Sequence, residues 1–192
     1  QLHTMTIRIA TYNVAKNYNP LGIQKIMDNL KLDYLATQEP PTTPEQHLRN
    51  LQHNSTTHPV TTIIDSTNNK IYINPTLADK KLHTLTAENR RCIFTTFHIH
   101  GQYVTICATY DYQRNTRSSI NKAYTKASEK IQKIYPNTQI IILGYFQSHA
   151  PEPTNQTIGT TRHPLPNHLL ITKLTTHPAT HISIIPHLNP PQ

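Results

Sequence analysis

The spacing of apolar and polar residues predicts strands and helices from the start of the chain. Residues 5–14, MTIRIATYNV, alternate between apolar and polar side chains, which predicts a strand with one buried face. Residues 20–32 repeat apolar side chains at helical spacing and begin with a proline, which favours the first turn of a helix. Residues 34–38, YLATQ, predict a short strand that two following prolines would stop.

The middle of the chain predicts hairpins. Four apolar runs predict paired strands: residues 60–65 with 70–74, and residues 91–98 with 103–110. The second pair is joined by His100-Gly101-Gln102, the kind of short turn that a hairpin needs. Residues 44–51 predict a short helix between these hairpins and the first strands.

The last third of the chain predicts one long helix and one buried strand. Residues 118–134 repeat apolar side chains at helical spacing, and residues 138–143, TQIIIL, form the most hydrophobic strand pattern in the chain. A loop is predicted over residues 144–166, and final strands over residues 168–174 and 181–185.

Mixed strands with few helices predict an α/β fold in which two packed mixed β-sheets are flanked by helices. A length of 192 residues fits one domain, which we expect to span residues 1–185. The Pro-rich tail of residues 186–192 is expected to fray.

The charge of the chain indicates one class of partner. Eighteen basic residues against ten acidic ones give a formal net charge of +8, and basic surfaces attract phosphate backbones. The basic residues are scattered along the sequence, so a solvated surface that only keeps the protein soluble explains the charge equally well.

The cysteines and the hydrophobic runs exclude other classes. Cys92 and Cys107 are the only cysteines, and two cysteines in apolar strands make neither a disulfide framework nor a zinc site. No run approaches the length of a membrane span, and the N-terminus has no signal-peptide pattern. We therefore expect an intracellular protein with no membrane contact.

Chemically suggestive residues follow one another at the predicted strand ends. Asn13 ends IATYN, Gln38 and Glu39 end DYLATQE, Tyr110 ends VTICATY, and residues 144–149, GYFQSH, follow the buried strand. In this order the landmarks resemble the endonuclease/exonuclease/phosphatase (DNase-I-like) family. The Gln-Glu-Pro form resembles the AP-endonuclease-like domains of non-LTR retrotransposons in particular.

Residues 166–171, PNHLLI, resemble more weakly the Ser-Asp-His motif with which the family closes. The resemblance implies a four-layer α/β sandwich, shortened near the C-terminus because few residues separate GYFQ from this closing motif. It also implies Mg²⁺-dependent (or Mn²⁺-dependent) hydrolysis of phosphodiester bonds in DNA. A hard cation of this kind prefers carboxylate oxygen. By the resemblance Glu39 and Asn13 bind the metal, Tyr110 and His168 act on the phosphate, and the positions that bind substrate are Gln147 and His149.

The implied partner is nucleic acid, with DNA favoured over RNA. The resemblance further implies a nuclear location and membership of a larger retrotransposon polyprotein.

Two positions depart from the family pattern. Tyr145 stands where the family has the Asp of Gly-Asp-Phe-Asn, and Asn167 stands where it has the Asp of Ser-Asp-His. A carboxylate orients or deprotonates the attacking water, and removing a general base commonly costs about 10²–10⁴-fold in rate. We therefore predict strongly reduced or lost activity.

Two alternatives remain open beside a weakened endonuclease. One is an inactive nuclease-fold module that binds nucleic acid or a protein partner, and the other is a decayed element with no selected function.

Overall fold

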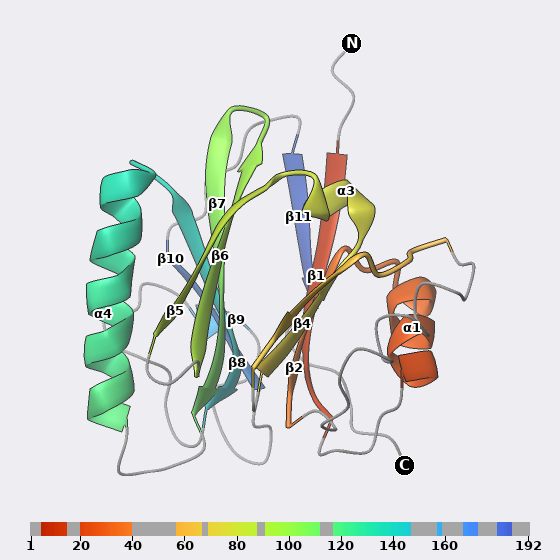
Figure 1. Ribbon diagram of the computed structural model, residues 1–192, viewed down its shortest axis with the longest axis horizontal. Coiled ribbons are helices and arrows are strands. Elements are labelled where there is room, and N and C mark those ends of the chain that lie inside the picture. The colour runs from red at the N-terminus through yellow and green to blue at the C-terminus, as the bar shows by residue number, and fades with distance from the viewer. Residues whose placement is uncertain are drawn as a thin grey trace.

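The chain folds into two β-sheets packed face to face, with helices on both outer sides (Figure 1). The computed structural model describes residues 5–14, 20–39, 57–66, 69–87, 91–111, 117–146, 157–158, 167–172 and 180–185. Across the described part, the layers run from α1 through a five-stranded sheet and a six-stranded sheet to α4. The predicted α/β sandwich is therefore confirmed.

The five-stranded sheet, called the first sheet below, has the strand order β11-β1-β2-β4-β3. Its strands are β1 (Met5–Asn13), β2 (Tyr34–Gln38), β3 (Thr62–Asp65), β4 (Asn69–Ile73) and β11 (Thr180–Ile185). β1 runs parallel to β2 and β11, and β4 is antiparallel to both β2 and β3. Between β1 and β2 the chain forms α1 (Pro20–Asn29), whose Ile23 and Met27 pack on the outer face of this sheet with Tyr72.

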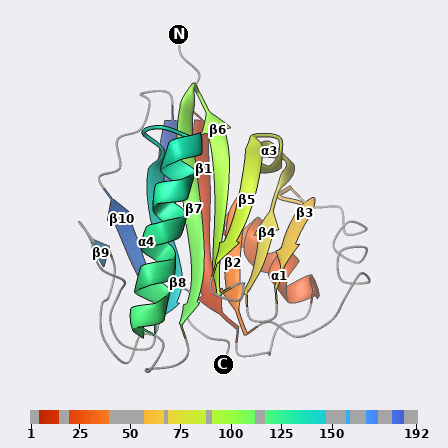
Figure 2. The ribbon, with the colours of Figure 1, turned by 60° about the vertical axis from the view of Figure 1, so that its left-hand side comes forward.

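The six-stranded sheet, called the second sheet, has the order β5-β6-β7-β8-β10-β9. Its strands are β5 (Lys81–Ala87), β6 (Cys92–Ile99), β7 (Gln102–Asp111), β8 (Gln139–Phe146), β9 (Thr157–Ile158) and β10 (Asn167–Thr172). β7 and β8 are parallel, and they are connected through α4 (Arg117–Ile134). Ala127 and Ile131 of α4 cover the outer face, which Figure 2 shows with α4 in front of β7 and β8.

The main core lies between the sheets. Ile9 and Tyr34 of the first sheet and Phe97 and Ile141 of the second sheet are fully buried in one cluster. Each such side chain contributes about 1.5–3 kcal/mol to folding by leaving water. This shared core fixes the strand ends of one sheet in position relative to those of the other sheet.

Most predicted elements are confirmed, with a few corrections. α1 ends at Asn29 instead of at residue 32, because Lys31 takes a left-handed backbone conformation (φ 53°). The loop predicted to begin at residue 144 is wrong at its start, since β8 continues to Phe146, and β9 lies inside that range. β5 and the short helix α3 (Pro75–Ala78) were not predicted.

The predicted helix at 44–51 and the tail at 186–192 lie outside the described residues. Within the part of the chain that is described, no helix has the length and apolar character needed to cross a membrane.

Candidate functional site

Three polar residues form a row across one end of the first sheet. The strand register pairs Asn13 of β1 with Gln38 of β2, and Gln38 with Asn69 of β4. In β1 and β4 these positions continue the alternation that turns Ile9 and Ile71 toward the opposite sheet. Gln38 and Asn69 are fully buried, and Asn13 is half-buried. The interior of the sandwich is therefore polar at this end.

Gln38 fixes the end of β2. Its side-chain amide donates to the Thr11 hydroxyl at 3.0 Å, and the backbone carbonyl oxygen of Gln38 accepts from the backbone N–H of Val14 at 3.0 Å. β1 and β2 therefore stay joined up to the residue before Glu39. The sequence motif assigns Gln38 no role of its own. In the structure its hydrogen bonds fix the end of β2 and thereby the position of Glu39.

Glu39 leaves the strand with a left-handed backbone conformation (φ 52°) and a half-buried side chain. For a residue with a side chain this conformation costs about 1–2 kcal/mol. Such strain persists where surrounding contacts enforce it, and it is found disproportionately at functional sites. The predicted metal ligands Glu39 and Asn13 are thus brought to one strand end, one register step apart.

A second row lies across the corresponding end of the second sheet. The register pairs Tyr110 of β7 with Tyr145 of β8, and Tyr145 with Asn167 of β10. His168 pairs with Gly144, next to this row. Four of the predicted site positions are therefore neighbours in the backbone register, although they are far apart in sequence. The predicted substrate-binding residues Gln147 and His149 lie outside the described residues.

The two rows meet through Arg91. The side-chain amide of Asn69 donates to the Arg91 carbonyl oxygen at 2.9 Å, and the backbone N–H of Tyr110 donates to the same oxygen at 2.8 Å. Figure 1 shows β1, β2, β7 and β8 all ending toward the lower edge of the view. The two rows and Arg91 are called the strand-end site below.

Arg91 and Asn69 were missed in the sequence. Arg91 is buried with 7% exposure, and its backbone carbonyl oxygen is the atom that joins the two rows. The Asn69 side-chain oxygen is buried and has no hydrogen-bond partner among the described residues. A basic residue directly before a buried strand was the available signal for Arg91, whereas Asn69 resembled an ordinary turn residue.

The strand-end site offers few metal ligands of its own. They suit an ion that a substrate also coordinates better than one that the protein alone binds tightly. Glu39 supplies one carboxylate, and Asn13 an amide oxygen. Among the described residues no group of three or more His, Cys, Asp or Glu side chains could hold a metal ion. Mg²⁺ is often bound by one or two carboxylates together with substrate phosphates. Glu39 and Asn13 would supply at most one carboxylate and one amide oxygen to such an ion, and substrate phosphate and water would have to supply its other ligands.

The fold matches known structures, although the sequence matches no protein-family model and no curated protein. Humanized D. rerio TDP2 is similar with a TM-score of 0.60 and 13% identity, covering 88% of this chain and 83% of that one. D. rerio TDP2 complexed with a single-strand DNA product is similar with a TM-score of 0.59 and 12% identity, covering 88% and 85%.

An endonuclease/exonuclease/phosphatase family protein from Leptotrichia buccalis gives a TM-score of 0.52 and 12% identity, covering 86% of this chain and 87% of that one. These similarities establish the DNase-I-like fold of endonuclease/exonuclease/phosphatase proteins, which the sequence landmarks had predicted.

Proposed function

We propose that this chain is a DNA-binding domain derived from a metal-dependent endonuclease of retrotransposon type, with strongly reduced or lost phosphodiester hydrolysis. One observation carries the proposal. The row Tyr110–Tyr145–Asn167 crosses three neighbouring strands at the strand-end site and contains no carboxylate.

The missing carboxylates affect the chemical step directly. Hydrolysis needs a group that orients or deprotonates water, and an Asp or Glu does this easily at neutral pH. A tyrosine hydroxyl in water has a pKa near 10, and an amide accepts no proton under these conditions. The residues at positions 145 and 167 therefore make poor replacements for a general base.

The residues that remain are suited to binding. Glu39 and Asn13 would hold a magnesium or manganese ion together with a backbone phosphate, and the ion would neutralise charge on that phosphate. Arg91, next to the same edge, adds a permanent positive charge that attracts phosphate. The net charge of +8 attracts the DNA backbone over longer distances.

DNA is the proposed partner because of the fold and the charge together. A protein of the same fold, D. rerio TDP2, has been solved with a single-strand DNA product. A domain of retrotransposon type would act in the nucleus as part of a larger polyprotein.

A plasmid assay tests the proposal. With Mg²⁺ or Mn²⁺ present, we expect salt-dependent binding of duplex DNA and little or no nicking by the wild-type protein. Binding should weaken steeply with salt, because phosphate contacts release counterions.

The matched variants are Glu39→Ala at the strand-end site and Glu129→Ala, an exposed glutamate on α4. Robust nicking that Glu39→Ala abolishes and Glu129→Ala preserves would show an active endonuclease and overturn the proposal. Absence of duplex binding at low salt would equally contradict it, and would indicate a protein partner instead.

A further inference from the structure

Four aromatic rings form a row beside the C-terminal end of α4. The ring centroids of His98 and Tyr103 are 5.2 Å apart, those of Tyr103 and Tyr135 are 5.1 Å apart, and those of Tyr135 and His83 are 6.4 Å apart. His98 is exposed, and the other three side chains are half-buried. The ring row joins β5, β6, β7 and the end of α4 into one partly exposed aromatic surface.

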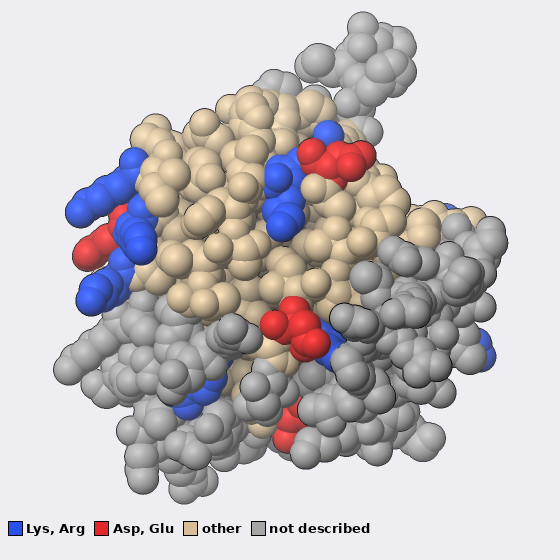
Figure 3. Space-filling view, in the orientation of Figure 1, with Lys and Arg blue, Asp and Glu red and all other residues tan. Residues whose placement is uncertain are grey.

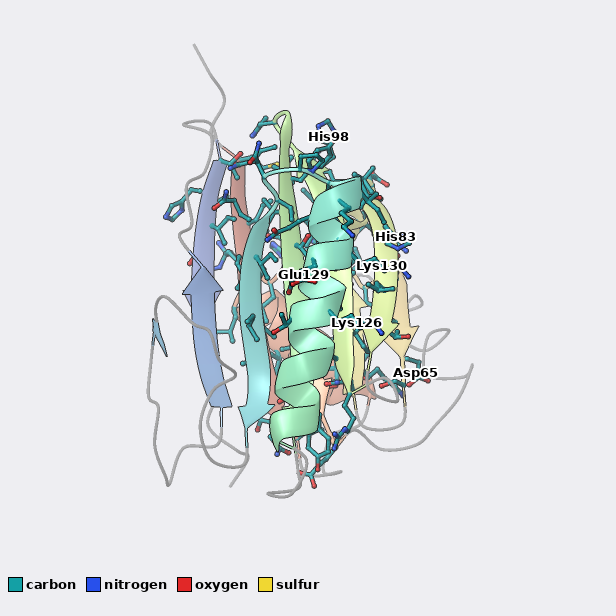
Figure 4. All side chains as sticks on the ribbon, turned by 90° about the vertical axis from the view of Figure 1, so that its left-hand side faces the viewer. Asp65, His83, His98, Lys126, Glu129 and Lys130 are labelled. Atoms are coloured by element: carbon teal, nitrogen blue, oxygen red, sulfur yellow. The ribbon has the colours of Figure 1, made fainter. Side chains whose placement is uncertain are left out.

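Lysines of α4 lie next to the ring row. Lys126, Lys130 and Lys133 are all exposed. Lys126 and Lys130 are about 6 Å apart along the helix axis, one turn from each other. Figure 4 shows these two on the side of α4 that faces β5, in line with His83, while Glu129 lies on the other side of the helix.

The charge of this surface is mainly positive. Figure 3 shows basic side chains projecting from the edge of the molecule where α4 lies. The charged residues of α4 whose side chains are described are Lys126, Lys130, Lys133 and Glu129. Because Glu129 points away from β5, the strip formed by Lys126, Lys130 and the ring row is basic and aromatic together.

Exposed apolar side chains occur on the same elements. Leu82 of β5 and Ile134 of α4 are the large hydrophobic residues that stand out as exposed among the described residues, each with 49% exposure. Leu82 directly precedes His83 in the chain, and Ile134 directly precedes Tyr135, so both adjoin residues of the ring row.

This strip is separate from the strand-end site. Tyr103 lies at the turn end of the β6–β7 hairpin, and Tyr110 lies near the opposite end of β7. Seven residues of extended strand span about 23 Å. A ligand on the strip therefore does not overlap one held at Glu39 and Asn13.

We propose that the strip of Lys126, Lys130 and the ring row is a second binding site, and that it binds single-stranded DNA. Bases stack on aromatic rings while lysines contact the backbone phosphates, a combination that recognises single strands without reading sequence. A duplex keeps its bases stacked inside, so it offers this row only phosphates. The choice of DNA over RNA rests on the proposed function.

The lysines are tested by fluorescence anisotropy with a labelled oligo-dT strand. Lys126→Gln combined with Lys130→Gln should weaken binding at least about fivefold. The same change should make the negative slope of the log association constant against log salt concentration shallower by about 1.4. Each lost phosphate contact on a single strand contributes about 0.7 to the size of that slope. The matched control is Lys25→Gln in α1 with Lys31→Gln two residues after it, both exposed lysines; α1 lies on the opposite side of the molecule from α4.

The rings are tested by His98→Ala, with His181→Ala, an exposed histidine of β11, as the control. Loss of one stacking ring should weaken binding at least about fivefold, and the control should leave it unchanged. Photo-crosslinking with 5-bromouracil oligonucleotides should label peptides containing Tyr103 or Tyr135.

Equal losses in the test and control variants, or crosslinks confined to the strand-end site, would overturn the second site. If the wild-type protein binds duplex DNA but not oligo-dT, the second site is refuted and the proposed function stands. Absence of duplex binding with oligo-dT binding intact would instead refute the proposed function and leave the second site in place.

Discussion

At the scale of single residues, Gly144 occupies a position where no side chain fits. A Cβ atom there would lie 1.9 Å from the Thr109 carbonyl oxygen, and the backbone has a φ of +133°. This close contact joins β7 to β8, because Thr109 and Gly144 are register partners. It lies immediately before the row at Tyr110 and Tyr145. Gly144 therefore has a structural role at this strand end whatever the chemistry of the residue that follows it.

Gly144→Ala should lower the free energy of unfolding by about 3 kcal/mol or more, because steric overlap with backbone adds to the strain of the positive φ. Gly101→Ala is the matched control. Gly101 also has a positive φ (74°) but open space around it, so the loss there should be about 1–2 kcal/mol. Denaturant unfolding measures both, and equal losses would contradict the close approach.

Tyr34 and Tyr72 are two buried tyrosines with different hydroxyl environments. The Tyr34 hydroxyl has no hydrogen-bond partner among the described residues, whereas the Tyr72 hydroxyl is hydrogen-bonded to Thr37. Tyr34→Phe should therefore raise the free energy of unfolding by about 1 kcal/mol, and Tyr72→Phe should lower it by about 1 kcal/mol. Thermal or denaturant unfolding at neutral pH would show the opposite signs, and two losses would contradict this account.

The same tyrosines predict instability at alkaline pH. Burial raises the pKa of the Tyr34 hydroxyl, with a further rise from the Cys107 thiol, and burial likewise raises the pKa of Tyr72. Both stay protonated in the folded chain where the unfolded chain would ionise. Stability is thus complete below about pH 10 and falls as pH rises above it. Tyr34→Phe should make that fall shallower in unfolding curves recorded across this range.

At the scale of elements, Asp33 ties β1, β2 and α3 together. Its buried carboxylate accepts from the Arg8 backbone N–H at 2.8 Å and from the Asn74 side chain at 2.6 Å. Asn74 in turn is the N-cap of α3 and accepts from the Leu77 backbone N–H at 3.2 Å. One carboxylate therefore fixes the path of the chain from β4 into β5.

Asp33→Asn should lower the free energy of unfolding by about 2–3 kcal/mol, because the amide turns one of the two acceptor oxygens into a donor that faces the donor of either Arg8 or Asn74. Asp79→Asn, at the exposed C-cap of α3, is the control and should change stability by no more than about 0.5 kcal/mol. Chemical denaturation compares the two variants. An Asp33→Asn variant as stable as the wild type would show that these hydrogen bonds contribute little.

The elements that sequence reasoning missed share a physical cause. β5 is an edge strand with a register shift between Lys81 and His83, so the alternation of apolar and polar residues is interrupted. α3 is one turn long and has no room for a helical repeat, although the pair Asn74-Pro75 is a good start signal. The apolar run ends at Leu143, and a glycine follows it, so the pattern does not show that β8 continues to Phe146.

At the scale of the whole molecule, the fold was predictable because its landmarks stand at strand ends in a fixed order. Asn13 and Gln38 end adjacent parallel strands, Glu39 follows Gln38 directly, and parallel strands bring their ends to one edge. The link through Arg91 was not predictable, because it depends on how the two sheets pack. No local pattern encodes a contact between Asn69 and a carbonyl group of the opposite sheet.

We propose that the strand-end site keeps residues suited to binding metal and DNA and lacks the carboxylates needed for hydrolysis. The most direct measurement is the rate of plasmid nicking in Mg²⁺ or Mn²⁺ by the wild type, by the restored variant Tyr145→Asp with Asn167→Asp, and by the restored variant carrying Glu39→Ala. We expect the restored variant to nick at least about 10²-fold faster than the wild type, and Glu39→Ala to abolish that gain. Nicking by the wild type that is already fast and is not increased by the two carboxylates would contradict the account.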